Sequence, residues 1–129
     1  MLTNTQVHEF KKQLDKRFLE LREEIQLELL ESDDQTYIDL AGLVHDIGEA
    51  SVADLLVDLQ LDSVDRHIRE IRDIDAALMR IASGNYGICS ECENPIAVDR
   101  LKVYPTAKRC QPCQAGYETS RGGLSGPSL

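Results

Sequence analysis

The chain has 129 residues, with 23 acidic against 14 basic side chains and a formal net charge of −9. Two Phe, four Tyr and no Trp are too few large aromatic side chains for a thick globular core. No apolar run approaches the roughly 20 residues that span a bilayer, and the first residues do not resemble a signal peptide. We therefore expect a cytoplasmic protein without a membrane segment, built as one domain or as an elongated element with a small module.

Residues 5–43 are predicted to form one long helix. Thr3 or Asn4 can cap its start, because a side-chain oxygen there can accept a hydrogen bond from a free backbone N–H. The pattern weakens in the acidic stretch 31–35 and returns at 37–44. The apolar residues recur at steps of three and four, the spacing of a single helical face: Val7, Phe10, Leu14, Phe18, Leu21, Ile25 and Leu29.

A second helix is predicted over residues 51–83. Ser51 and Asp54 have the spacing of a capping box at its start, and Gly84 can adopt the left-handed conformation that ends many helices. A short connection containing Gly48 joins the two helices, so we expect an antiparallel coiled-coil hairpin with its tip at about 44–51. The seam of the second helix follows a heptad with one polar interruption: Val57, Leu61, Val64, Ile68, Ile71 and Leu78.

The charge distribution argues against autonomous nucleic-acid binding. Between Arg22 and Arg66 there are 13 acids and no basic residue. A protein that holds phosphates by itself needs a basic face. The chain offers only a small basic cluster near its C-terminal cysteines, so direct sequence-specific DNA binding is not expected: Arg100, Lys102, Lys108 and Arg109.

Four cysteines form two Cys-x-x-Cys pairs, with 17 residues between the pairs. This spacing is typical of a four-thiolate zinc site, and the interval has room for two short strands and a turn. Four thiolates fill the tetrahedron of Zn²⁺, so we expect one structural ion and no catalytic metal. Two disulfides or a redox pair are the alternatives, and we favour zinc in the absence of a signal peptide and a βαβ pattern. The ligands would be Cys89, Cys92, Cys110 and Cys113.

The expected fold class is therefore mainly α, a long antiparallel coiled-coil hairpin plus a small four-cysteine zinc-finger module with a short C-terminal helix. We expect the hairpin over 1–83, and the finger with its helix over 84–121. Tyr86 is expected to pack on the zinc module. Residues 122–129, rich in Gly and Ser, are expected to be a disordered tail.

The stretch from Gly84 to Glu118 resembles the DksA/TraR zinc-finger proteins, bacterial regulators of RNA polymerase. The resemblance rests on Gly84-Asn-Tyr-Gly-Ile-Cys89-Ser-Glu-Cys92, Ile96, Arg100-Leu101, Pro105-Thr-Ala107 and Cys110-Gln-Pro-Cys113-Gln. With the preceding hairpin, it covers about residues 5–118. It implies a regulator that docks on RNA polymerase in the bacterial cytoplasm and inserts its coiled-coil tip into the secondary channel, without binding DNA. An acidic tip is attracted to a basic, metal-bearing channel.

The resemblance also assigns residues. The best-studied members carry Asp-x-x-Asp-x-Ala at the tip, where gapless alignment from the first cysteine places Asp46, Glu49 and Ser51. Arg66 falls where the family has a basic residue that contacts the polymerase rim, and Arg100 with its basic neighbours is a candidate polymerase contact or a weak nucleic-acid patch. The positions that would respond to guanosine tetraphosphate hold no cation, so we expect little binding of that nucleotide there: Asp73, Tyr104 and Gln114.

Three hypotheses follow. The first is a monomeric, non-enzymatic regulator that acts on RNA polymerase. The second is a zinc-stabilised interaction protein of the same fold with another partner and little activity on transcription. The third is an enzyme, a redox protein or a zinc buffer, which we rank last because no nucleophile–base constellation is visible and a four-thiolate site has no open coordination position.

Overall fold

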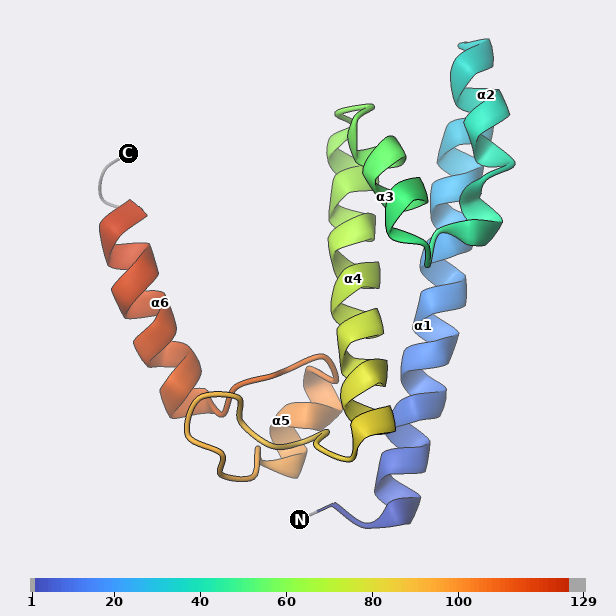
Figure 1. Ribbon diagram of the computed structural model, residues 1–129. Helices are drawn as coiled ribbons and strands as arrows, with labels where there is room; N and C mark the ends of the chain where they lie inside the picture. The colour runs from blue at the N-terminus through green and yellow to red at the C-terminus, as the bar shows by residue number, and fades with distance from the viewer. Residues whose placement is uncertain (1, 126–129) are drawn as a thin grey trace. The chain divides into compact units, whose positions relative to one another are not determined.

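The structure, a computed structural model, describes residues 2–125 as helices joined by loops (Figure 1). The mainly helical fold class expected from the sequence is confirmed. Among the described residues, no helix combines the length and the apolar character needed to cross a bilayer. The elements are α1 (Asn4–Leu30), α2 (Gln35–Ala41), the 3₁₀ helix η1 (Val44–Asp46), α3 (Ala50–Val57), α4 (Asp62–Ser83), α5 (Val98–Val103) and α6 (Gln111–Ser125).

The chain divides into two compact units. One is Lys12–Ala76, and the other comprises residues 2–11 and 77–125 of the described chain. Each unit has its own buried apolar residues, so each is described by itself.

The start of α1 and the end of α4 have the capping residues expected from the sequence. The Gln6 backbone N–H donates to Thr3 Oγ1 at 3.1 Å, and the Thr3 N–H donates to Gln6 Oε1 at 2.9 Å. This reciprocal pair is a capping box at the start of α1. At the end of α4, Gly84 has φ +82°, and the Asn85 N–H donates to the Arg80 carbonyl at 3.0 Å. Gly84 is therefore the left-handed terminator that the sequence predicted.

Within Lys12–Ala76, α1 and α4 pair antiparallel. Most of the apolar positions predicted for these helices are buried, among them Leu14, Leu21, Ile25 and Leu29 on α1 and Val64, Ile68 and Ile71 on α4. The others are partly exposed: Val7, Phe18, Val57, Leu61 and Leu78. Ile74 is 1% exposed, whereas its neighbour Asp75 is exposed. Ile74, one residue before the polar heptad position Asp75, thus takes its place in the seam and keeps the seam apolar.

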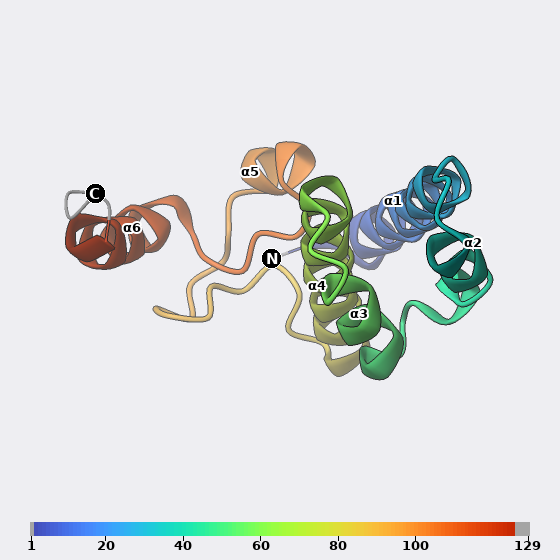
Figure 2. The ribbon, with the colours of Figure 1, turned by 90° about the horizontal axis from the view of Figure 1, so that it is seen from above.

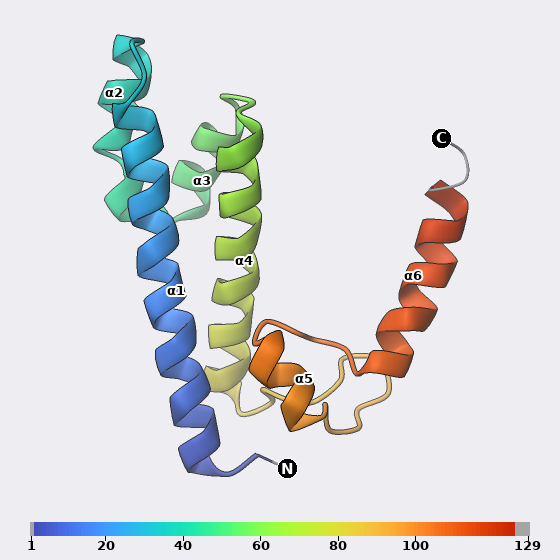
Figure 3. The same cartoon turned by 180° about the vertical axis from the view of Figure 1, so that it is seen from behind.

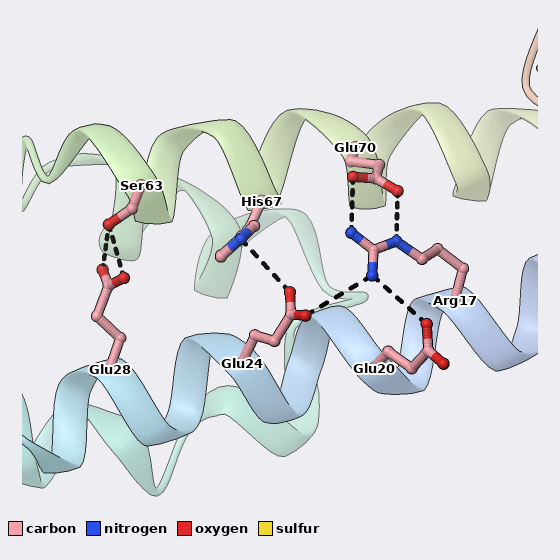
Figure 4. A network of polar contacts seen from close by, with 7 residues as sticks. All are labelled: Arg17, Glu20, Glu24, Glu28, Ser63, His67 and Glu70. Carbon is pink, nitrogen blue, oxygen red and sulfur yellow. Dashed lines mark hydrogen bonds and ion pairs between the residues drawn. The ribbon is translucent and has the colours of Figure 1, made fainter.

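A row of polar contacts fixes the register of α1 against α4 (Figure 4). Arg17 Nε and its terminal nitrogen donate to the two oxygens of Glu70 at 2.6 and 3.2 Å. His67 Nε2 lies 3.4 Å from a Glu24 oxygen. Further along, the Ser63 hydroxyl lies 2.6 Å from both oxygens of Glu28. Residue numbers rise on α1 as they fall on α4, which is the signature of an antiparallel pair.

Both predicted long helices are interrupted, and the predicted tip is in a different place. The helix expected over 5–43 breaks at 31–34, and the one expected over 51–83 breaks at 58–61. Residues 31–61, here called the arm, fold back so that α2 lies beside α1 and α3 beside α4 (Figures 1 and 2). The acidic turn 44–51 therefore does not cap two uninterrupted helices. A Cβ placed on Gly48 would lie 3.9 Å from Cζ of Phe18 on α1.

The fold-back has a packing reason. Arm residues Ala41, Val44, Ile47, Ala53 and Leu56 are each at most 3% exposed. A two-helix hairpin buries little surface for its length, and a second layer of helices buries more. The start of α3 also differs from prediction, because Glu49, not Ser51, occupies its N-cap position.

The second unit contains the finger (Figure 3). Its buried side chains include Phe10, Tyr86, Ile96, Leu101 and Ala107. The interval between the cysteine pairs holds α5 in place of the two short strands considered above, and Pro95 at its start forms an antiparallel β-bridge with Ile88, just before the first pair. The final helix is longer than expected: α6 reaches Ser125, so 122–125 are helical, and residues 126–129 of the predicted tail lie outside the described residues.

Candidate functional site

The first cysteine pair sits in a tight turn closed by backbone hydrogen bonds. The Cys89 N–H donates to the Asn94 carbonyl at 2.9 Å, and the Glu93 N–H donates back to the Cys89 carbonyl at 3.0 Å. Glu93 has φ +62°, a left-handed conformation that helps to reverse the chain. The Ser90 N–H donates to the Lys108 carbonyl at 2.8 Å, which links this turn to the segment before the second pair.

The second pair is placed by the start of α6. Cys110 precedes the helix and Cys113 lies in its first turn. The Gln114 N–H donates to the Cys110 carbonyl at 2.9 Å. Side chains three residues apart on a helix lie on the same face, so the sulfurs of Cys110 and Cys113 lie on the same side of the start of α6.

The four sulfurs converge as a zinc site requires. All four Sγ atoms lie within 4.8 Å of one another, and those of Cys92 and Cys110 are 3.7 Å apart. A tetrahedron with Zn–S bonds of about 2.3 Å has edges of about 3.8 Å. The cysteines are free thiols, so the donor set, its number and its spacing fit a structural Zn²⁺ held by Cys89, Cys92, Cys110 and Cys113.

The thiol chemistry agrees with this fit. Burial raises the pKa of Cys89, but hydrogen bonds from the backbone of Cys92, Cys110 and Glu91 lower it more, to about 6. Hydrogen bonding to the thiols of Cys110 and Cys92, with some desolvation, raises the pKa of Cys113 to about 12. One thiolate is favoured while its neighbour holds its proton. A divalent cation removes this conflict, because it binds the thiolate form of each cysteine and offsets two of the four negative charges.

Residues 84–118 match the prokaryotic dksA/traR C4-type zinc finger. The RNA polymerase-binding transcription factor DksA of Caulobacter vibrioides is 40% identical over 60 residues, which are 46% of this chain and 42% of that protein. The protein of the same name from Salmonella typhimurium is 24% identical over 125 residues, 97% of this chain and 80% of that one. The solved structure of transcription factor DksA2 from Pseudomonas aeruginosa has a TM-score of 0.63 and 27% identity, and the match covers 92% of this chain and 87% of that one.

Residues 84–118 therefore form a zinc finger of the dksA/traR C4 type. The match to the Caulobacter relative spans less than half of that protein's length. The specific likeness is concentrated in the finger, where the sequence had already indicated the family.

Two of the four basic side chains of this DksA/TraR finger are engaged within it. Arg109 Nε donates to Glu91 at 3.1 Å, and its guanidinium stacks 3.8 Å from the centre of the Tyr117 ring. Arg100 Nε donates to the Arg109 carbonyl at 3.1 Å, and Arg100 lies 5.4 Å from the Tyr104 ring centre. Lys102 and Lys108 are exposed. Arg100 and Arg109 therefore brace the finger, a role that sequence reasoning missed because their partners are distant in the chain or on its backbone.

Tyr86 packs on the zinc module, as expected. Its ring lies 5.7 Å from that of Phe10, and its hydroxyl donates to the Pro105 carbonyl at 2.7 Å. Burial raises the pKa of Tyr86 to about 12, against a smaller lowering by Arg80. The tyrosine thus joins the segment before the first cysteine pair to the segment before the second.

The structure places the tip residues on one exposed turn of the arm. Asp46 ends η1, Glu49 precedes α3 and Ser51 lies in the first turn of α3, all three exposed. Ile47, which is 1% exposed, anchors this turn. Arg66 is exposed on α4. The structure brings these three positions together on one turn, which lies along α1 and not past its end.

Proposed function

We propose that this protein is a transcription regulator that binds bacterial RNA polymerase, inserts its acidic turn into the secondary channel, and does not bind DNA directly. The observation that carries the proposal is the dksA/traR finger at residues 84–118, because relatives with this finger are named as RNA polymerase-binding transcription factors. The site of action is then the bacterial cytoplasm, where the polymerase works.

Charge supports the same function. The arm has eight acids and no Lys or Arg, and its exposed carboxylates Asp46 and Glu49 share one turn. Such a segment is drawn toward a basic channel that contains a metal ion. Arg66 and Arg100 are the basic side chains proposed to contact the polymerase outside the channel. The chain performs no chemistry in this proposal, because four thiolates leave zinc no open coordination position.

The decisive experiment combines polymerase binding with transcription from a sensitive promoter. Asp46→Asn removes one charge and nearly preserves shape, so we expect binding within about twofold of the parent and loss of most of the transcriptional effect. Asp58→Asn is the matched control, since Asp58 is also an exposed acid of the arm. An Asp46→Asn protein as active as the parent would refute the role of the turn.

The proposed contact between Arg66 on α4 and RNA polymerase is tested by substitution. Arg66→Ala should weaken polymerase binding roughly tenfold, the size of about 1.4 kcal/mol for a lost charge contact. Arg69→Ala, another exposed arginine of the same helix, should have little effect. Equal losses in both variants would indicate general charge attraction and not a defined contact.

A second function remains a candidate: a zinc-stabilised interaction protein with another partner and little activity on transcription. The folded-back arm favours it, since the acidic turn is packed along α1. Glu49 and Ser51 stand where the best-studied family members have Asp and Ala, and this also favours weaker activity. Failure of the protein to compete with an active family member for polymerase would select this function.

Guanosine tetraphosphate is expected to add little. Asp73, Tyr104 and Gln114 supply no positive charge for a polyphosphate, and a carboxylate there is repulsive. We expect the transcriptional effect to be unchanged within about twofold when the nucleotide is added. A strong enhancement would point to a different nucleotide site.

A further inference from the structure

The two junctions of the arm can each be helical. Residues 31–34 and 58–61 contain no Gly and no Pro, whereas the turn between them contains Gly42 and Gly48. Gln60 has φ +58°, a left-handed conformation that is unfavourable for a residue with a Cβ. The heptad residues Val57, Leu61 and Val64 also keep their spacing across this break. At 58–61 the sequence therefore favours helix where the structure interrupts it, whereas at 31–34 the Asp34 carboxylate accepts from the Thr36 N–H at 2.9 Å and caps α2, a contact that a continuous helix would give up.

Apolar burial holds the arm down, since Ala41, Val44, Ile47, Ala53 and Leu56 are each at most 3% exposed. Val44 and Ile47 are its buried anchors in the turn, and the groove of about 340 Å³ beside them is lined by Leu19 and Leu27 of α1 and by His45. Leu19 and Leu27 are about half exposed. Polar contacts also tie the arm to α1 and α4: Gln26 Nε2 donates to the Ala41 carbonyl at 3.3 Å, and Arg72 donates to Asp54 at 2.6 Å.

Net charge opposes the folded-back state. The arm has eight acids and no Lys or Arg, and the rest of the Lys12–Ala76 unit has ten acids against seven basic residues. Folding the arm onto α1 and α4 therefore brings two negatively charged layers together. Salt screens such repulsion between exposed charges over about 10 Å at 0.1 M.

We propose that the arm is a hinged regulatory device with two states. In the state seen here, the acidic turn is pinned along α1. In the other, the junctions at 31–34 and 58–61 are helical, α1 continues into α2, α3 continues into α4, and Asp46 lies beyond Leu30 and Asp62. The purpose of the device, control of entry into the polymerase channel, rests on the proposed function, but the two states do not.

The states differ in one measurable distance. Spin labels at His45 and Lys16 can be introduced through a bioorthogonal amino acid, which leaves the zinc thiols untouched. His45 lines the same groove as Leu19, one helical turn from Lys16, so the folded-back state gives a short distance. In the extended state the labels are separated by about 40 Å, from the rise of 1.5 Å per residue.

Buried charge should open the arm. Val44→Asp and Ile47→Asp place a carboxylate at positions that are 1% exposed, and we expect the label distance to shift to about 40 Å with a gain of helical signal. Leu55→Asp is the control, because Leu55 is an apolar arm residue that is 43% exposed, and it should keep the short distance. In the unsubstituted protein, lowering salt should increase the long-distance fraction.

Two results would overturn the device. One is a short distance in both buried-charge variants and at every salt concentration. The other is a broad distance distribution with loss of helix, because an arm that unfolds loses the 7 residues of α2 and the 8 of α3. Neither measurement uses polymerase, so neither depends on the proposed function.

The regulatory purpose has its own measurement. If the arm is extended in about a tenth of the molecules, a variant locked open should gain up to tenfold in apparent affinity for polymerase. Val44→Asp is compared with Leu55→Asp in polymerase binding, with the label distance recorded in the bound state. A bound protein that keeps the short distance and still regulates transcription would show that entry does not require extension. Absence of binding in the parent protein and in both variants would refute the proposed function alone.

Discussion

Cys92 is the exposed member of the cysteine cluster, and its Sγ lies 3.7 Å from that of Cys110. Cys92→Ser should leave three thiolates, and the sulfur-to-metal charge-transfer band of the Co²⁺-substituted protein should fall by about one quarter. We expect zinc affinity to drop by more than about a hundredfold, since loss of an outer-sphere partner alone costs ten to a hundredfold. Ser90→Ala, beside the site but without a ligand atom, serves as the control. An unchanged band would exclude Cys92 from the coordination sphere.

Tyr86 gives the finger a pH-sensitive bond. Its pKa is raised to about 12 by burial, so the folded state retains its proton more firmly than the unfolded chain, whose value is about 10. The stability from Tyr86 is fully present below about pH 10 and is lost as the pH rises toward 12. Ultraviolet absorbance titration of the protein minus that of Tyr86→Phe should show a midpoint near 12. A midpoint near 10 would mean that the ring is solvated.

The Tyr86→Phe variant also tests the hydrogen bond to Pro105 at neutral pH. The substitution removes a 2.7 Å hydrogen bond and leaves the Pro105 carbonyl without that donor. We expect the free energy of unfolding to fall by about 1 kcal/mol. Urea unfolding of the two proteins at pH 7 measures that difference. Equal stabilities would show that water replaces the tyrosine hydroxyl.

At the scale of elements, the α1–α4 register depends on contacts of modest strength. Arg17 and Glu70 form a two-bond pair, and the hydrogen bond from Glu70 raises the pKa of Arg17 further above its usual range. Their side chains are 38% and 42% exposed, so solvent screens the pair and we expect a coupling of about 0.5 kcal/mol. A double-mutant cycle of Arg17→Met and Glu70→Gln measures it. The coupling should shrink in 1 M salt, and a salt-independent value would contradict a solvent-screened pair.

Sequence reasoning succeeded where structure is decided locally. The Cys-x-x-Cys spacing, Thr3 at the start of α1 and Gly84 at the end of α4 each meet a demand imposed within a few residues. The interruption at 58–61 lacks such a signal, since the stretch contains no Gly or Pro. The one at 31–34 has a local signal, because the Asp34 side chain accepts from the Thr36 N–H and caps α2. The folding-back of the arm depends on tertiary burial of Val44, Ile47 and Leu56 against distant residues. The partners of Arg17 and Arg109 were missed for the same reason, because long-range pairs leave no mark on periodicity.

At the scale of the whole molecule, the two units depend on zinc differently. The Lys12–Ala76 unit contains no cysteine and has a core of Leu21, Ile25, Ile68 and other apolar side chains. The finger has few buried residues of its own, and modules of that size need a metal or disulfide to fold. Zinc therefore stabilises one part of the chain and not the other.

Removing zinc should accordingly unfold the finger alone. In a reducing buffer with a strong chelator, we expect backbone amides of residues 84–118 to lose hydrogen-exchange protection, while those of α1 and α4 within residues 12–76 keep it. Most of the helical signal should remain, because α1 and α4 together contain 49 helical residues, 27 and 22. Added zinc should restore protection and polymerase binding together. Simultaneous loss of protection in both units would show that the finger's metal also maintains the α1–α4 pair, contrary to the separate cores seen here.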